Sequence, residues 1–192
     1  MTGTLQGKAI VISAPSGAGK TTLVKHLLVS IPSLAFSVSA CSRPKRENEI
    51  HGKDYYFISS DEFRHRIAHN EFMEWEEVYP GSFYGTLKSE IQRIWNNREI
   101  PIFDVDVQGG IHLKKYFGQD ALAIFLQPPS LETLETRLQN RCTESPESLQ
   151  KRLSKAASEL TFAGHFDRII VNHHLETACQ EAVMAINQFL AQ

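Results

Sequence analysis

A glycine-rich stretch near the start of the chain, SAPSGAGKTT at residues 13–22, contains the residue types that proteins use to bind phosphate groups. The pattern G-x-x-x-x-G-K-[ST] is nearly completed by Gly17, Gly19, Lys20 and Thr21. Glycines allow backbone N–H groups to converge on phosphate oxygens where a helix begins. The stretch therefore predicts a loop that holds a nucleoside triphosphate.

Two side chains of this loop would add chemistry of their own. Lys20 would reach the β- and γ-phosphates, and the Thr21 hydroxyl would ligate Mg²⁺. Ala14 replaces the first glycine of the pattern, which is tolerable because Pro15 favours extended backbone at the residue before it. The alternative is a glycine-rich turn that only joins a strand to a helix. The residues predicted to contact the triphosphate are Ala14, Pro15, Ser16, Gly17, Ala18, Gly19, Lys20, Thr21 and Thr22.

A second candidate anion site lies in the segment SVSACSRPKRENEIHGKDYYF, residues 37–57. It concentrates positive charge at Arg43, Lys45 and Arg46, and Tyr55 follows. Arginine guanidinium groups suit bidentate contact with a phosphate, and a tyrosine hydroxyl can add a further donor. A solvated basic loop fits the same stretch equally well. On these residues alone, both interpretations stand.

Strand-like and helix-like segments alternate along most of the chain. Short apolar runs rich in β-branched residues predict buried strands at residues 8–13, 100–106, 121–126 and 168–171. Each is followed by a helix-like stretch, and Ser130 can cap the one that follows residues 121–126. This order predicts an α/β fold in three layers, a parallel sheet with helices on both faces, of the kind that carries a P-loop.

The middle of the chain departs from that alternation. Residues 36–87 mix short strand-like runs, loops and aromatic residues, and they predict a small, partly β insert. Within it, Ser59 and Glu62 form a possible capping box for a helix that begins near Asp61. A second insert, a helical lid, is predicted at residues 141–163. The 192 residues would thus form a single domain, with its core at residues 1–35, 88–140 and 164–192.

Composition limits the partners and the compartment. The net charge is −2, which gives no reason to expect a nucleic-acid partner. The three cysteines, Cys41, Cys142 and Cys179, are far apart and odd in number, and no local pair has metal-ligand spacing. A disulfide framework is therefore not expected, which favours the reducing cytoplasm. No segment resembles a signal peptide or a membrane span.

Taken together, the motifs of the chain resemble those of the guanylate kinase family, in its bacterial form, over essentially the whole length. The marks are SAPSGAGKTT, SVSA, GKDYYF, EFMEW, FYGT, DVDVQG, IFLQPPS, RLQNR and KRL…A…E. The resemblance implies direct, in-line phosphorylation of GMP, and of dGMP, by ATP with Mg²⁺. It names residues 36–87 as the GMP-binding insert, and it leaves open whether the protein is a monomer or a homo-oligomer.

By the same resemblance, Ser39, Glu74 and Thr86 read the guanine base. A carboxylate such as Glu74 can accept from both N1–H and the 2-amino group of guanine. Adenine offers a bare N1 acceptor and no 2-amino donor, so Glu74 would remain unsatisfied beside it. Without the resemblance, Glu74 would be interpreted as a surface charge beside Trp75.

The resemblance also implies roles around the phosphates. The GMP phosphate would be held by Arg43, Arg46, Tyr55 and Tyr84. Asp106 would orient GMP and the arginines, and Asp104 would lie nearer the Mg²⁺ shell. The arginines of the lid region, which could otherwise be surface residues, would neutralise the transferring phosphoryl group: Arg137, Arg141 and Arg152. The residues with catalytic roles are Lys20, Arg43, Asp106, Arg137, Arg141 and Arg152.

Some positions depart from the usual family pattern, among them Asn48 and Cys142, which replace frequent glycines. Asn172 would approach the adenine of ATP, but His173 and His174 follow it where an acidic pair is common, so the adenine contacts stay open. No zinc site is predicted there. Two alternatives remain: a related domain that has lost catalysis and binds partner proteins, and another nucleotide kinase or P-loop GTPase.

Overall fold

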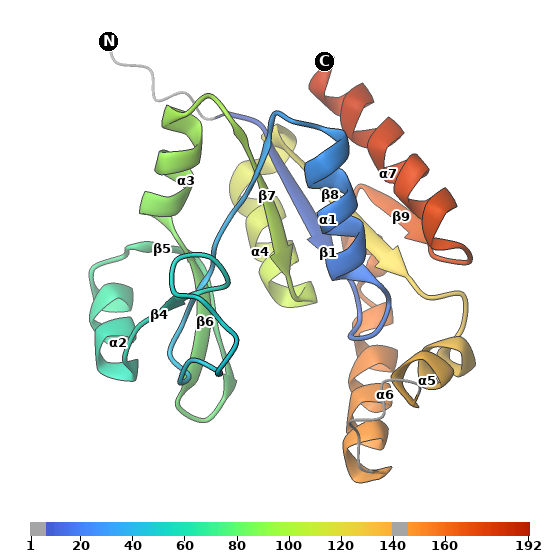
Figure 1. Cartoon of the computed structure of the whole chain (residues 1–192), viewed down its shortest axis with the longest axis horizontal. Coiled ribbons are helices and arrows are strands. Elements are labelled where there is room, and N and C mark those ends of the chain that lie inside the picture. Colours follow the sequence, from blue (N-terminus) through green and yellow to red (C-terminus); the bar gives the residue numbers. More distant parts are fainter. Residues whose placement is uncertain (1–6, 140–145) are drawn as a thin grey trace.

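The fold contains two β-sheets, with helices packed around them (Figure 1). A computed structural model describes residues 7–139 and 146–192. Arg141 and Cys142, which figured in the sequence predictions, lie outside the described residues. Within the described part of the chain, no helix is both long and apolar enough to cross a membrane.

The larger sheet has five strands in the order β2-β7-β1-β8-β9, and every neighbouring pair is parallel. Its strands are β1 (Ala9–Ser13), β2 (Leu34–Phe36), β7 (Ile100–Val105), β8 (Ala121–Gln127) and β9 (Arg168–Val171). Four of the five were predicted from their apolar runs. The short edge strand β2 was not, because a strand of this length carries little periodic signal.

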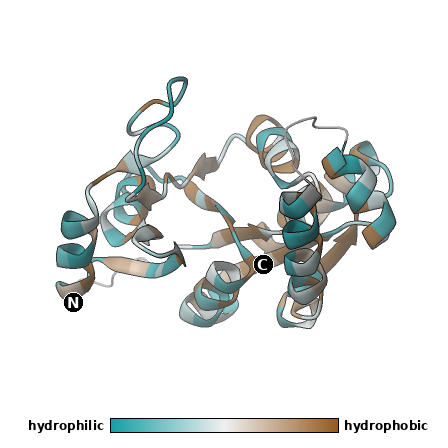
Figure 2. Cartoon of the chain, turned by 90° about the horizontal axis from the view of Figure 1, so that it is seen from below, coloured by the Kyte–Doolittle hydropathy of each residue, from teal (hydrophilic) through white to brown (hydrophobic). Residues whose placement is uncertain are grey.

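Helices cover both faces of this sheet, which confirms the predicted α/β class. They are α1 (Lys20–Ser30), α3 (Lys88–Asn96), α4 (Val107–Phe117) and α7 (Leu175–Leu190), with short 3-10 helices η1 (Gly118–Asp120) and η2 (Ala163–His165). Alternate residues of β1 enter different cores. Ile10 and Ile12 pack with α1 and α7, whereas Ala9 and Val11 pack with α4 and Phe103. Figure 2 shows the brown, apolar strands between helices that are partly teal.

The smaller sheet has four strands in the order β4-β3-β6-β5 and lies beside the larger one. Its elements are β3 (Ala40–Cys41), β4 (Tyr56–Phe57), α2 (Ser60–Ala68), β5 (Phe72–Tyr79) and β6 (Ser82–Leu87). Phe63 of α2 stacks on Phe72 and Phe83, which gives this sheet a core of its own. The Ser59 half of the predicted capping box is confirmed, because the Ser59 hydroxyl accepts from the Glu62 N–H at 3.1 Å and α2 begins at the next residue. The Glu62 carboxylate instead accepts from Arg66 at 2.7 Å.

Two further helices, α5 (Leu131–Gln139) and α6 (Pro146–Leu160), pack against each other on the opposite side of the large sheet from α2. Leu134 and Leu138 of α5 meet Ala156 of α6 in a small apolar cluster. The division of the chain into core, insert and lid remains a prediction.

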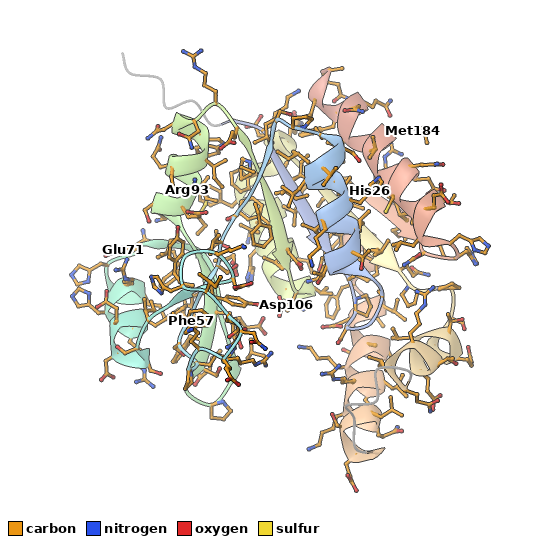
Figure 3. The ribbon with its side chains drawn as sticks, viewed as in Figure 1. His26, Phe57, Glu71, Arg93, Asp106 and Met184 are labelled. Atoms are coloured by element: carbon orange, nitrogen blue, oxygen red, sulfur yellow. The ribbon has the colours of Figure 1, made fainter. Side chains whose placement is uncertain are left out.

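Glu90, a buried carboxylate on α3, joins the larger sheet's helices to the segments that lead into the smaller sheet. Its two oxygens accept from the Val38 N–H at 3.1 Å and from the Tyr56 hydroxyl at 2.9 Å. Arg93, labelled in Figure 3, completes the cluster with two hydrogen bonds of 2.9 and 2.8 Å. These bonds hold the pKa of Glu90 below its usual value, although burial alone would raise it. Glu90 therefore works as an ionised acceptor between separate parts of the fold.

Replacing this acceptor should weaken the whole fold. Glu90→Gln removes the charge and puts an amide N–H₂ where two donors now point, so we expect the free energy of unfolding to fall by about 1.5–3 kcal/mol. Urea denaturation measures the change. Glu181→Gln is the matched control, because Glu181 is exposed on α7 and should shift stability by less than about 0.5 kcal/mol. Equal stability of the two variants would contradict the role of Glu90.

Candidate active site

Two neighbouring cavities open where the carboxyl ends of β1 and β7 meet. The first, called here the loop cavity, has a volume of about 300 Å³ and is lined chiefly by residues of the glycine-rich loop between β1 and α1. The second, called the insert cavity, has a volume of about 380 Å³ and reaches from the same loop to the smaller sheet. Parallel α/β sheets place their ligands at this end of the strands.

The backbone of the glycine-rich loop depends on two glycines in left-handed conformations, with φ of +94° at Gly17 and +104° at Gly19. A Cβ at Gly17 would lie 2.9 Å from Leu138 of α5, so the loop packs directly on that helix. A Cβ at Gly19 would lie 2.8 Å from the amide of Asn172. Both positions therefore need glycine for conformation and for space.

Asn172, the residue after β9, is hydrogen-bonded to the glycine-rich loop. Its buried side-chain N–H₂ donates to the Ala18 carbonyl at 2.7 Å, and its backbone carbonyl accepts from Arg137 of α5 at 2.9 Å. The predicted contact of Asn172 with adenine stays a prediction. The structure adds a different role, because Asn172 connects the loop to α5.

Lys20 is the first residue of α1 and is held at the end of β7. Its ammonium lies 2.7 Å from an Asp104 carboxylate oxygen and donates to the Val105 carbonyl at 2.6 Å. The strand register explains the contact, since Ser13 of β1 is paired with Val105 of β7. Thr21 follows Lys20 and lines both cavities.

Glu74 of β5 lies inside the insert cavity and is almost fully buried. The hydroxyl of Thr86, directly opposite on β6, donates to Glu74 Oε1 at 2.6 Å. Burial raises the pKa of this carboxyl to about 7, the charge of Asp106 adds to the rise, and the Thr86 bond opposes it. Glu74 is therefore a carboxyl group whose charge can change near neutral pH.

A pair of carboxyl groups, Glu76 and Asp106, lies in the same cavity, and of the two only Asp106 was predicted from the sequence. Asp106 caps α4 by accepting from the Gly109 N–H at 2.8 Å, and it lies at the lower end of β7 in Figure 3. Glu76 hydrogen-bonds to it, and this bond, with burial, raises the pKa of Glu76. Burial opposes ionisation of Asp106, but the Glu76 bond, the Gly109 N–H and the charges of Lys155 and Lys20 hold its pKa low. The pKa of Glu76 is thus raised while that of Asp106 is lowered, so Glu76 is the member of the pair that takes up a proton first as pH falls.

Glu76 carried one signal in the sequence. It stands two residues after Glu74, and residues at this spacing lie on the same face of a strand. The regular pairing of Glu74 with Thr86 and of Glu76 with Tyr84 puts both on the cavity side. The spacing from Glu74, the residue predicted to read the base, could therefore have identified Glu76 as a candidate site residue.

Arg43 is bound to its own segment. Its guanidinium forms a bidentate pair with Glu49, with distances of 2.6 and 2.5 Å, and its Nε donates to the Tyr84 hydroxyl at 3.1 Å. It also lies over the Tyr55 and Phe57 rings, 5.2 and 5.5 Å from their centroids. The pairing lowers the pKa of Glu49 to about 2. The guanidinium thus already has a carboxylate where an anionic ligand would bind.

The predicted site residues fall into three groups. The insert cavity brings together Ser39, Tyr55, Glu74, Tyr84, Asp104 and Asp106. Arg46 lies apart from that group and is exposed, with its backbone N–H donating to Glu49 at 2.8 Å. Arg137 and Arg152 lie on α5 and α6, on the side of the loop cavity. Arg141 is outside the described residues.

Comparison with known proteins places these features in a family. The family model described as Guanylate kinase matches residues 6–189. A guanylate kinase of Bacteroides fragilis is 50% identical over 185 residues, covering 96% of this chain and 91% of its own length. One from Porphyromonas gingivalis is 50% identical over 186 residues, covering 96% and 99%. The crystal structure of guanylate kinase from Anaplasma phagocytophilum, at 27% identity, superposes with a TM-score of 0.72 and covers 95% of this chain and 85% of that one.

The raised pKa of Glu74 can be measured directly. We expect its side-chain ¹³C carboxyl signal to titrate with a midpoint near pH 7, and the signal to disappear in Glu74→Gln. The ordinary value is 4.5, so the folded protein keeps a proton that the unfolded chain releases. The contribution of protonated Glu74 to the free energy of unfolding is therefore complete below pH 4.5 and is lost as pH rises toward 7. A midpoint below pH 5 would contradict the burial argument.

Proposed function

The chain belongs to the guanylate kinase family, and we propose that its two cavities carry out that family's reaction, in which ATP phosphorylates GMP to give GDP and ADP. The observation that carries the proposal is the connection between the cavities. Lys20, Thr21 and Asp106 line both of them, so a donor phosphate in one faces an acceptor phosphate in the other. A protein that only bound one nucleotide or a partner protein would not need that connection.

On the donor side, the glycine-rich loop would surround the β- and γ-phosphates of ATP. Lys20 would exchange its present partners, Asp104 and the Val105 carbonyl, for phosphate oxygens. A hydroxyl and a carboxylate are oxygen ligands of the hard type that Mg²⁺ prefers, so Thr21, with Asp104 nearby, fits the expected ion. When bound, Mg²⁺ would neutralise negative charge on the phosphates.

On the acceptor side, Glu74 would recognise guanine in its ionised form. Guanine presents two donors, N1–H and the 2-amino group, to a carboxylate that can accept both. Ser39 and Thr86 would complete the base site, and Thr86 already donates to Glu74. Adenine would leave this buried acceptor unsatisfied, which is the stronger kind of discrimination. The same contacts do not involve the 2′-hydroxyl, so dGMP would also serve.

The GMP phosphate would replace Glu49 as the partner of Arg43. A phosphate offers the guanidinium the same bidentate geometry as the carboxylate it now binds. Burial raises the pKa of Tyr55, so its hydroxyl remains a donor, and Tyr84 lies beside it with ring centroids 5.8 Å apart. Arg46 would come from the same loop of the insert, residues 36–87.

Transfer would proceed in line, without a covalent intermediate, because the chemistry needs positioning and charge neutralisation more than a protein nucleophile. Asp106 would orient GMP and the arginines. Arg137, Arg141 and Arg152 would add positive charge as residues 141–163 close over ATP, and closure would exclude the water that otherwise hydrolyses it. The two described cysteines, Cys41 and Cys179, are free thiols, which supports the expected reducing cytoplasm.

A survey of acceptors tests this function. With ATP and Mg²⁺, we expect rapid ADP formation with GMP and dGMP, and little with AMP, CMP or UMP. Lys20→Met should lower kcat for GMP by about 10²–10³-fold, since it removes a charge aimed at the phosphates. An unchanged melting temperature serves as the control for folding. A wild-type protein that turns over none of the five acceptors would overturn the proposal.

Specificity should depend on Glu74. Glu74→Gln replaces a charged acceptor, so kcat/KM for GMP should fall by an amount equivalent to about 1.5–3 kcal/mol. AMP should gain little, because Ser39 and Thr86 would still suit a purine oxygen. The measurement is kcat/KM for both acceptors in wild type and variant, across pH 6–8. The GMP value for the wild type should also rise with pH as Glu74 ionises, and that rise should be reduced in the variant. An unchanged GMP-to-AMP ratio would show that Glu74 does not read the base.

A further inference from the structure

Four of the described residues line both the loop cavity and the insert cavity: Lys20, Thr21, Asp106 and Lys155. The first three already have roles in the proposed reaction. Lys155 has none, and no motif in the sequence pointed to it. It lies on α6, far along the chain from the glycine-rich loop, and it reaches the junction through which a phosphoryl group would pass.

The charges around this junction are unbalanced. Carboxyl groups in the insert cavity come from Asp54, Glu74, Glu76, Asp104 and Asp106, and Glu159 adds another in the loop cavity. Among the described lining residues of both cavities, the lysines and arginines are Lys20 and Lys155 alone. A triphosphate and a monophosphate that meet here need positive charge, and Lys20 supplies only part of it.

Lys155 can supply more positive charge because its ammonium is only weakly paired. Its ammonium lies 3.7 Å from Glu159 Oε1, one turn further along α6, and 57% of its side chain is exposed. Lys20, by comparison, has partners at 2.7 and 2.6 Å. The charge of Lys155 also acts on Asp106 and Glu76, on the far side of the junction. The ammonium is thus attracted from both sides of the path, and among the described residues it forms an ion pair at 3.7 Å with Glu159.

The backbone under this side chain is anchored to α5. Ala156, the next residue, is buried between Leu134 and Leu138 of α5, and α5 is bonded through Arg137 to Asn172 under the glycine-rich loop. Lys155 therefore combines an anchored Cα with a flexible four-carbon chain. A phosphate entering between the cavities can capture the ammonium without moving the helix.

We propose that Lys155 is a further catalytic residue, whose ammonium contacts the phosphoryl group in transit between the two nucleotides. The inference rests on the proposed function. Charge on the transferred group is spread over its equatorial oxygens in the transition state, and a cation held there lowers the barrier more than it tightens binding of either substrate alone. Lys155 thus contributes mainly to kcat.

If Lys155 served only to stabilise α6 through its ion pair with Glu159, a different result would be expected. A pair four residues apart on a helix surface, such as Lys155 with Glu159, contributes only a few tenths of a kcal/mol to helix stability. If that were the whole function, loss of the ammonium would change the melting temperature slightly and leave the kinetics alone. The two roles are therefore separable by comparing kcat with stability.

The test compares Lys155→Met, Lys155→Arg and Lys151→Met with the wild type. Lys151 is the matched control, because it is an exposed lysine one turn earlier on α6 and lines neither cavity within the described residues. We expect Lys155→Met to lower kcat about 10–100-fold, less than loss of a fully buried donor, with KM values for ATP and GMP within about threefold. Lys155→Arg should recover most of kcat, and Lys151→Met should match the wild type.

A second measurement uses a bridged ligand, adenosine and guanosine joined through five phosphates, which occupies both cavities and the junction. Its Kd should rise in Lys155→Met by a factor similar to the fall in kcat, whereas Kd values for ATP alone and GMP alone should hardly change. Equal kcat in Lys155→Met and the wild type, or an equal loss in Lys151→Met, would overturn the assignment. An inactive wild type would instead refute the proposed function itself.

Discussion

The contact between Lys20 and the end of β7 determines how the rest of the site is arranged. Because β1 and β7 are parallel neighbours with Ser13 paired to Val105, the loop after β1 begins beside the last residues of β7. Lys20 therefore meets Asp104 at 2.7 Å, and Asp106, two residues later, caps α4. A shift of one residue in this register would turn the Asp104 side chain to the opposite face. The glycine-rich loop and two carboxylates of the insert cavity, Asp104 and Asp106, are thus placed by a single strand pairing.

The protein without ligands keeps its charges in internal pairs. Lys20 is bound to Asp104 and Arg43 to Glu49, while Glu76 is hydrogen-bonded to Asp106. In the proposed reaction, a phosphate that binds Lys20 or Arg43 would displace the carboxylate now paired with it, so the net gain in binding energy would be only the difference between two strong interactions. A neutral or wrongly shaped ligand gains nothing from the exchange. The carboxyl partners therefore add selectivity, because they keep buried cations from being left unpaired.

Local patterns predicted much of this structure from the sequence. Strand β9 was expected at residues 168–171 and is found there, and the loop glycines were identified by spacing alone. Glu90 was missed because its partners include residues far away along the chain, such as Val38, which is 52 residues distant. Lys155 was missed because the cavities that it lines are formed by segments far away along the chain. A charged residue on a helix or strand resembles a solvated one until the fold brings its partner near. The roles of the arginines were available only through the family resemblance.

The two nucleotide sites are anchored to the core by different contacts. The donor side is a continuous chain: Asn172 holds Ala18 of the loop, Arg137 holds Asn172, and α5 packs on α6 through Leu134 and Leu138. The acceptor side belongs to the smaller sheet, which is joined to α3 through Glu90. Lys155 is therefore connected through α5 to the glycine-rich loop, whereas Glu74 and Arg43 belong to the other unit. Any movement that brings the nucleotides together can change the distance between these units without disturbing either set of contacts. Catalytic groups that must act at the junction, such as Lys155, then need flexible side chains, because neither unit alone fixes the distance they have to span.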